Sequence, residues 1–218
     1  MPKPTFFRLA EEKRLRLIKA AYAEFSRAPF AEASISNIIK DAGIPRGSFY
    51  QYFEDKADVF FYLLDRMRES TDVAVRESVA ANDGDFFAAM NDLFDRFINE
   101  IVTGPYKDFY TNVFMYMDFH AVSRLTPAHE KPMPPKGHGE VTRYLLTAID
   151  RSTLRVKTDD DMRMLIRQVM GLFMQTIGYY YNRRAAGEIL SIETVKRRLA
   201  QLLNWIQYGV VDAKEAHE

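Results

Sequence analysis

Residues Ser34 to Lys56 read S-I-S-N-I-I-K-D-A-G-I-P-R-G-S-F-Y-Q-Y-F-E-D-K, and this stretch decides the fold. Ser34 is a typical helix N-cap, because its hydroxyl can accept a hydrogen bond from a free amide of the first turn. The apolar stripe of the helix that follows consists of Ile35, Ile38, Ile39 and Ala42. Gly43 ends this helix, because glycine adopts the left-handed conformation without a steric clash. Pro45 fits the first turn of a second helix.

The second predicted helix has two different faces. Phe49 and Phe53 lie four residues apart and face the core. The opposite face carries Arg46, Gly47, Ser48, Tyr50, Gln51 and Tyr52. This composition suits a surface that meets DNA, although a solvated helical hairpin has the same pattern of faces.

The chemistry of DNA divides these outward residues into two groups. Arg46 and Gln51 are the predicted base contacts, because arginine bonds bidentately to guanine and glutamine to adenine. The predicted phosphate contacts, which fix position rather than sequence, are Ser36, Ser48, Tyr50, Tyr52 and Lys56. Pro45 and Gly47 complete the predicted DNA-binding set, Gly47 because it lacks a side chain where a backbone approaches closely. Lys56 follows the predicted N-cap Asp55, and a lysine at a helix N-terminus favours phosphate.

The segment G-I-P-R-G-S-F-Y-Q-Y-F-E-D-K-A-D-V-F resembles the recognition segment of the TetR family of bacterial transcriptional regulators. The positions that carry the resemblance are Gly43, Arg46, Gly47, Ser48, Phe49, Tyr50, Phe53 and Lys56. The resemblance covers about the first quarter of the chain. It implies an N-terminal DNA-binding bundle, a helical ligand-binding domain with an inducer pocket, and a dimer formed through the last two long helices.

The charge distribution agrees with an N-terminal DNA-binding segment. The 218 residues have a formal net charge of zero, yet residues 1–56 carry ten Lys or Arg against seven Asp or Glu. The basic excess therefore lies on the segment assigned to DNA. The chain has no cysteine, so it cannot form disulfides or a cysteine zinc site. No apolar run has the length of a membrane span, and the pattern of a signal peptide is absent, which together indicate a cytoplasmic protein without membrane contact.

Two expectations concern the segments before Ser34. Residues 1–8 should form a frayed terminus, with contact to the DNA backbone as the alternative. A helix should then run from Leu9 to Arg27, and its buried stripe should consist of Leu15, Ile18, Ala21, Tyr22 and Phe25.

The region after Lys56 contains helical patterns rich in aromatic residues and methionine. An adaptable apolar pocket is expected there, lined by Phe94, Phe97, Phe114, Met117, Met170, Phe173 and Met174. Ordinary core packing is the alternative for each of these residues. An apolar lining suggests a small hydrophobic ligand, such as a drug-like compound or a fatty acyl chain.

Residues 126–139 carry four prolines and two glycines and are expected to form a long loop. His129, Glu130, His138 and Glu140 cluster there, but their spacing matches no zinc pattern. We therefore expect no metal site and no cofactor. No catalytic motif is present either, so no catalytic residues are assigned.

These observations predict an all-α protein. Residues 1–53 should form a three-helix, helix-turn-helix DNA-binding domain, and residues 54–218 a larger helical domain for ligand binding and dimerisation. The predicted function is sequence-specific transcriptional regulation, with a homodimer binding a near-palindromic double-stranded operator as a repressor under the control of a hydrophobic ligand. The alternatives are a helical carrier or sensor of hydrophobic ligands that does not bind DNA, and an enzyme whose site assembles only in space.

Overall fold

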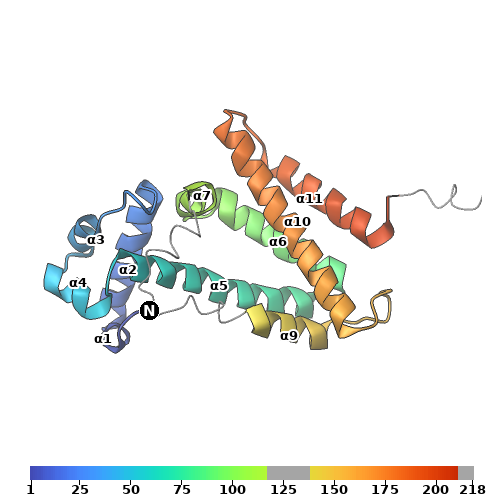
Figure 1. Cartoon of the computed structure of the whole chain (residues 1–218), viewed down its shortest axis with the longest axis horizontal. Coiled ribbons are helices and arrows are strands. Elements are labelled where there is room, and N and C mark those ends of the chain that lie inside the picture. Colours follow the sequence, from blue (N-terminus) through green and yellow to red (C-terminus); the bar gives the residue numbers. More distant parts are fainter. Residues whose placement is uncertain (117–137, 211–218) are drawn as a thin grey trace, which may run out of the picture. The chain divides into compact units, whose positions relative to one another are not determined.

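The computed structural model describes residues 1–116 and 138–210 (Figure 1). Every regular element within these ranges is a helix, so the predicted all-α class is confirmed. The chain divides into two compact units, Met1–Thr71 with Gly104–Pro135 and Asp72–Thr103 with Lys136–Glu218. The helix α5 (Lys56–Ala81) belongs to both units. The division predicted after Phe53 concerns function rather than compactness, and it stays a prediction.

The first unit contains α1 (Pro4–Phe7), α2 (Glu11–Arg27), α3 (Ile35–Ala42), α4 (Arg46–Tyr52), the start of α5 and α7 (Lys107–Tyr116). Helix α2 packs against α3 and α7. The Asn112 side chain of α7 donates to two carbonyl oxygens at the end of α2, those of Phe25 at 2.8 Å and Ser26 at 3.0 Å. Large side chains that are almost completely buried fill this unit: Phe6, Leu17, Phe25, Ile38, Phe49, Phe53, Leu63 and Phe109.

The N-terminal segment is ordered, so the expectation of a frayed terminus was wrong. Phe6 is completely buried, and its ring centroid lies 4.9 Å from that of Phe53. The backbone amide of Lys3 also donates to the carbonyl oxygen of Tyr52 at 2.8 Å. A terminus frays when nothing outside it holds its backbone, and here both a ring and a backbone hydrogen bond hold it.

The second unit contains the end of α5, α6 (Phe86–Thr103), α9 (His138–Ala148), α10 (Asp159–Ala185) and α11 (Ile192–Tyr208). Thr158 and Ser191 cap α10 and α11, because their side chains accept from the amides of Asp161 and Thr194. Helix α10 packs against α6, α9 and α11. In the described parts of the chain, no helix is both long and apolar enough to cross a membrane.

Candidate nucleic-acid interface

The turn between α3 and α4 has the predicted helix cap and helix end, and it differs from the prediction at Pro45. The Ser34 hydroxyl accepts from the amide of Ser36 at 3.2 Å and caps α3. Gly43 adopts the left-handed conformation, with φ 61° and ψ 40°. The amide of Ile44 donates to the carbonyl oxygen of Ile39, which closes the helix end. Pro45 is the N-cap of α4 rather than a residue of its first turn.

Helix α4 presents the two faces that the sequence predicted. Phe49 and Phe53 are completely buried. Arg46, Gly47, Tyr50 and Gln51 are exposed on the other side, while Ser48 and Tyr52 are half-buried. The Arg46 guanidinium lies 5.8 Å from the ring centroid of Tyr50, so a cation–π interaction joins these two outward side chains.

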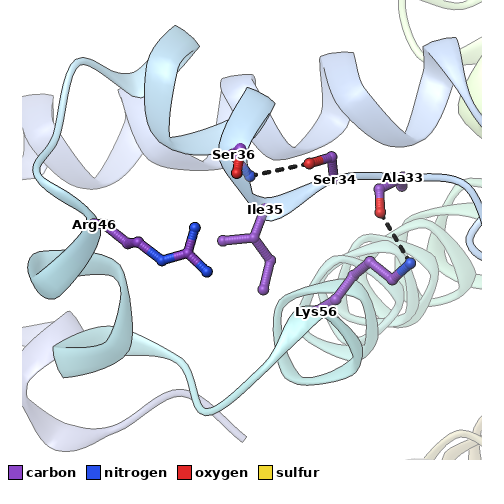
Figure 2. Close-up of a pocket in the computed structure, with 6 residues that line it drawn as sticks. All are labelled: Ala33, Ser34, Ile35, Ser36, Arg46 and Lys56. Carbon is purple, nitrogen blue, oxygen red and sulfur yellow. Dashed lines mark hydrogen bonds between the residues drawn. The ribbon is translucent and has the colours of Figure 1, made fainter.

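A shallow hollow of about 320 Å³ lies where the start of α3 meets α4 and α5. Its lining residues are Ala33, Ser34, Ile35, Ser36, Arg46 and Lys56 (Figure 2). Figure 2 shows Ile35 between the side chains of Arg46 and Lys56. Three predicted contact residues, Ser36, Arg46 and Lys56, therefore share one hollow. Two cations beside the N-terminus of α3, which is the positive end of the helix dipole, favour an anion such as a backbone phosphate.

Lys56 also has a structural role that the sequence did not reveal. Its ammonium donates to the carbonyl oxygens of Ala31 at 3.0 Å and Ala33 at 2.9 Å, and it lies 4.9 Å from the ring centroid of Phe30. Burial lowers the pKa of Lys56, against the opposing field of the Glu24 carboxylate. An ammonium has three donors, so one remains for a phosphate. The phosphate contact stays a prediction.

The predicted N-cap of α5 is confirmed. The Asp55 carboxylate accepts from the amide of Asp58 at 2.8 Å. The buried Asp58 carboxylate in turn accepts from the amide of Glu54 at 3.1 Å. These paired bonds fix the chain between α4 and α5.

Glu24 is a buried carboxylate that supports this interface and that sequence reasoning missed. Its side chain is 1% exposed and binds the Arg27 guanidinium at 2.6 Å. It also accepts from the backbone amide of Ser34 at 2.6 Å and from the Asn37 side chain at 3.1 Å. Burial raises the pKa of Glu24, but these hydrogen bonds outweigh burial, so its pKa lies below its ordinary value. Glu24 thereby ties α2 to the start of α3.

The predicted ligand-binding residues lie in different environments. Phe94 and Phe173 are buried and stack with ring centroids 4.7 Å apart, and Phe97 lies 5.8 Å from Phe173. Met170 is half-buried, whereas Met174 is 51% exposed. Phe114 is half-buried and belongs to the first unit, and Met117 lies outside the described residues. The structure thus brings three rings together, and the ligand-binding role stays a prediction.

His129 and Glu130, from the cluster weighed as a metal site, also lie outside the described residues. Within residues 1–116 and 138–210, no group of three His, Asp or Glu side chains is placed to hold a metal ion.

Two protein families match the chain. The family described as "Bacterial regulatory proteins, tetR family" matches residues 17–63, which run from within α2 through α3 and α4 to the start of α5. The family described as "Tetracyclin repressor-like, C-terminal domain" matches residues 85–210, which is more than half of the chain.

Individual relatives of the chain are also named as transcriptional regulators. The chain is 32% identical over 93 residues to the HTH-type transcriptional regulator TtgR of Pseudomonas putida, covering 43% of this chain and 44% of the relative. It is 33% identical over 75 residues to the HTH-type transcriptional regulator EthR of Mycobacterium tuberculosis, covering 34% of each chain. The chain thus spans less than half of the length of these curated relatives.

Solved structures share the fold over a greater length. A TetR family transcriptional regulator from Chloroflexus aurantiacus J-10-FL is 28% identical, with a TM-score of 0.55 over 96% of this chain and 98% of that one. A further solved structure, of a protein from Pseudomonas aeruginosa PAO1, has a TM-score of 0.62 over 94% of this chain and 96% of that one at 16% identity, which supports the fold alone.

Proposed function

The chain belongs to the TetR family of bacterial regulatory proteins, and we propose that it is a sequence-specific DNA-binding transcriptional regulator that acts in the cytoplasm. The observation that carries this proposal is the outward face of α4. An exposed arginine and glutamine, Arg46 and Gln51, stand there on a helix whose other face is completely buried. A rigid helix with donors of this kind suits the major groove.

In this proposal α4 enters the major groove while α3 and the start of α5 contact the backbone. Arg46 and Gln51 contact base edges, and Ser48, Tyr50 and Tyr52 contact phosphates. The hollow lined by Ser36, Arg46 and Lys56 receives one further phosphate. A homodimer would then bind two half-sites of a near-palindrome, about one helical turn or a small multiple apart.

The homodimer is supported by apolar side chains on the last two helices. Met164 and Met174 on α10 and Trp205 and Ile206 on α11 are exposed in the single chain. Burying apolar surface of this kind stabilises association.

We further propose that the regulator is a repressor whose DNA affinity falls when a small hydrophobic ligand binds the second unit. The aromatic group Phe94, Phe97 and Phe173 supports an apolar ligand. Helix α5 belongs to both units, so a ligand that moves α5 would change the spacing of two DNA-binding heads.

Selection from random duplexes tests DNA binding directly. The purified protein is incubated with random duplex DNA, and bound molecules are recovered at moderate salt and sequenced. Enrichment of one near-palindrome is expected, and it would give the operator. If no sequence is enriched, either alone or with cell extract added as a source of corepressor, the DNA-binding proposal is wrong.

Removing the Arg46 side chain should weaken operator binding selectively. For Arg46→Ala we expect a loss of roughly 1–3 kcal/mol together with relaxed specificity at one base position, because a bidentate base contact disappears. Lys56→Ala should instead weaken binding to all sequences alike. Fluorescence anisotropy with the selected duplex and single-base variants measures both effects, and affinities equal to wild type for both variants would contradict the assignment.

The class of ligand is tested by thermal shift. Apolar compounds, including fatty acyl chains, should raise the melting temperature and release the selected duplex, because a ligand that binds only the folded state stabilises it. Stabilisation by polar metabolites alone would contradict an apolar pocket. Tighter DNA binding in the presence of the ligand would contradict release.

A further inference from the structure

The recognition helix α4 is short, and most of the carbonyl groups at its C-terminal end accept hydrogen bonds from the first residues of the chain. Helix α4 has seven residues, and the last four carbonyl groups of any α-helix lack partners inside the helix. The carbonyl oxygen of Phe49 accepts from the amide of Phe53 at 2.9 Å. The remaining three carbonyl groups, of Tyr50, Gln51 and Tyr52, all accept from Lys3 or Thr5.

The three bonds come from three different donors. The Lys3 ammonium donates to the carbonyl oxygen of Tyr50 at 2.9 Å. The Thr5 hydroxyl donates to the carbonyl oxygen of Gln51. The backbone amide of Lys3 donates to the carbonyl oxygen of Tyr52 at 2.8 Å. The positive charge of Lys3 is also favourable here, because the C-terminus of a helix carries the negative end of its dipole.

Residues 3–6, which we call the N-terminal clamp, are themselves anchored. Phe6 is completely buried, with ring centroids 4.9 Å from Phe53 and 5.1 Å from Tyr62. The amide of Phe6 donates to the carbonyl oxygen of Lys3 at 2.9 Å, which starts the short helix α1. The clamp is therefore a fixed support rather than a loose arm.

We propose that the N-terminal clamp sets the orientation of the last turn of α4 and thereby the base specificity of the regulator. This rests on the proposed function, because the residues held by their carbonyl groups, Tyr50, Gln51 and Tyr52, are those assigned to bases and phosphates. Lys3 and Thr5 are positioning residues and do not contact DNA. A single helical turn is marginal on its own, so losing these bonds lets the C-terminal turn fray and lets Gln51 adopt several orientations.

Hydrogen exchange tests the clamp without DNA. Lys3→Met removes the ammonium but keeps the backbone amide, and Thr5→Val removes the hydroxyl at nearly constant shape. Each should speed exchange of the amides of residues 50–53 by about 3- to 10-fold, the factor expected for one hydrogen bond. Exchange within α2 should be unchanged. Arg8→Met is the matched control, since Arg8 is exposed and carries the same charge. Wild-type exchange in α4 of both clamp variants would overturn the proposal.

The second measurement compares DNA affinities, and it distinguishes a role of Lys3 and Thr5 in positioning Gln51 from a general loss of protein stability. The discrimination ratio is the affinity for the selected duplex divided by the affinity for a duplex changed at the base that Gln51→Ala identifies. Lys3→Met and Thr5→Val should lower this ratio several-fold at a temperature where each variant is folded. A loss of stability alone leaves the ratio unchanged, because the folded fraction cancels.

The salt dependence of binding identifies a direct contact. If Lys3 bound a phosphate, Lys3→Met would reduce the slope of log affinity against log salt by about one and leave the discrimination ratio unchanged. That result would overturn the positioning role. An unchanged slope with a lower ratio supports it. If no duplex is selected at all, the proposed function fails and the specificity role fails with it, while hydrogen exchange still decides whether the clamp holds α4.

Discussion

Gly84→Ala should destabilise the second unit by roughly 2–4 kcal/mol, the sum of backbone strain and a weakened hydrogen bond. Gly84 follows α5 with φ 79°, in the region that side chains disfavour. A Cβ atom at this position would lie 2.9 Å from the carbonyl oxygen of Ala148 and 3.2 Å from the amide nitrogen of Asp150. Urea unfolding followed by Trp205 fluorescence measures the effect, because this single tryptophan lies in the second unit.

The close approach at Gly84 is a packing requirement as well as a conformational one. The amide of Asp150 donates to the carbonyl oxygen of Gly84 at 2.9 Å, so the turn after α5 and the residues after α9 share a backbone hydrogen bond. A methyl group must push the two backbones apart, and neither is the flexible end of a side chain. The hydrogen bond then lengthens or breaks.

Gly187→Ala is the matched control for this prediction. Gly187 has nearly the same conformation, φ 84°, but a Cβ atom there would meet nothing within 4 Å. Gly187→Ala should therefore lower the free energy of unfolding only by the strain of the left-handed conformation, about 1–2 kcal/mol. The difference between the two variants isolates the close approach. If both variants lost the same stability, the contact of the Cβ atom with Ala148 and Asp150 would have no energetic effect, and the prediction for Gly84 would be wrong.

Local rules predicted the helix-turn-helix because each of them involves residues close in sequence. Ser34 caps α3 through the amide two residues on, and Gly43 ends the same helix. Phe49 and Phe53 define the buried side of α4 through their spacing alone. The remaining residues of α4 were then expected to face outward, so the candidate interface could be predicted from the sequence.

Contacts between residues far apart in sequence were not predictable in this way. Phe6 packs on Phe53 and Tyr62, and no periodic pattern in a tail of eight residues indicates such partners. Four members of the predicted buried stripe of α2 are buried, but Leu15 is 41% exposed and Leu17 is buried instead, so the buried side is turned around the helix from the predicted one. An apolar stripe shows roughly which side of a helix is buried, whereas the packing partners, here α3 and α7, decide how wide that side is.

Glu24 is the clearest case of a residue that only the fold explains. Its position continues the buried side of α2, seven residues after Leu17 and three after Ala21, where a charged residue is unexpected. The sequence alone therefore shows a charged residue on a side of the helix that should be buried. Its partners, the amide of Ser34 and the side chain of Asn37, became known only with the packing of α2 on α3.

Glu24→Gln should destabilise the first unit by roughly 1–3 kcal/mol at neutral pH, because hydrogen bonds to a charged group are stronger than neutral ones. The pKa of Glu24 in the folded protein lies below its ordinary value of 4.5, since hydrogen bonds from Arg27, Ser34 and Asn37 outweigh burial. The ionised carboxylate therefore contributes its full stability above about pH 4.5 and loses it as the pH falls through the lower, folded value. Urea unfolding followed by helical circular dichroism measures this between about pH 7 and about pH 3.

The difference in stability between wild type and Glu24→Gln should be constant above about pH 5 and shrink towards acid, because the protonated carboxyl group resembles the amide. Glu32→Gln is the matched control: Glu32 is exposed in the same unit, and its loss should change stability by no more than about 0.5 kcal/mol. A difference that does not vary with pH would mean that Glu24 acts by shape rather than charge. Because Glu24 holds the first turn of α3, which lines the hollow with Arg46 and Lys56, its loss should also weaken binding to all duplexes alike.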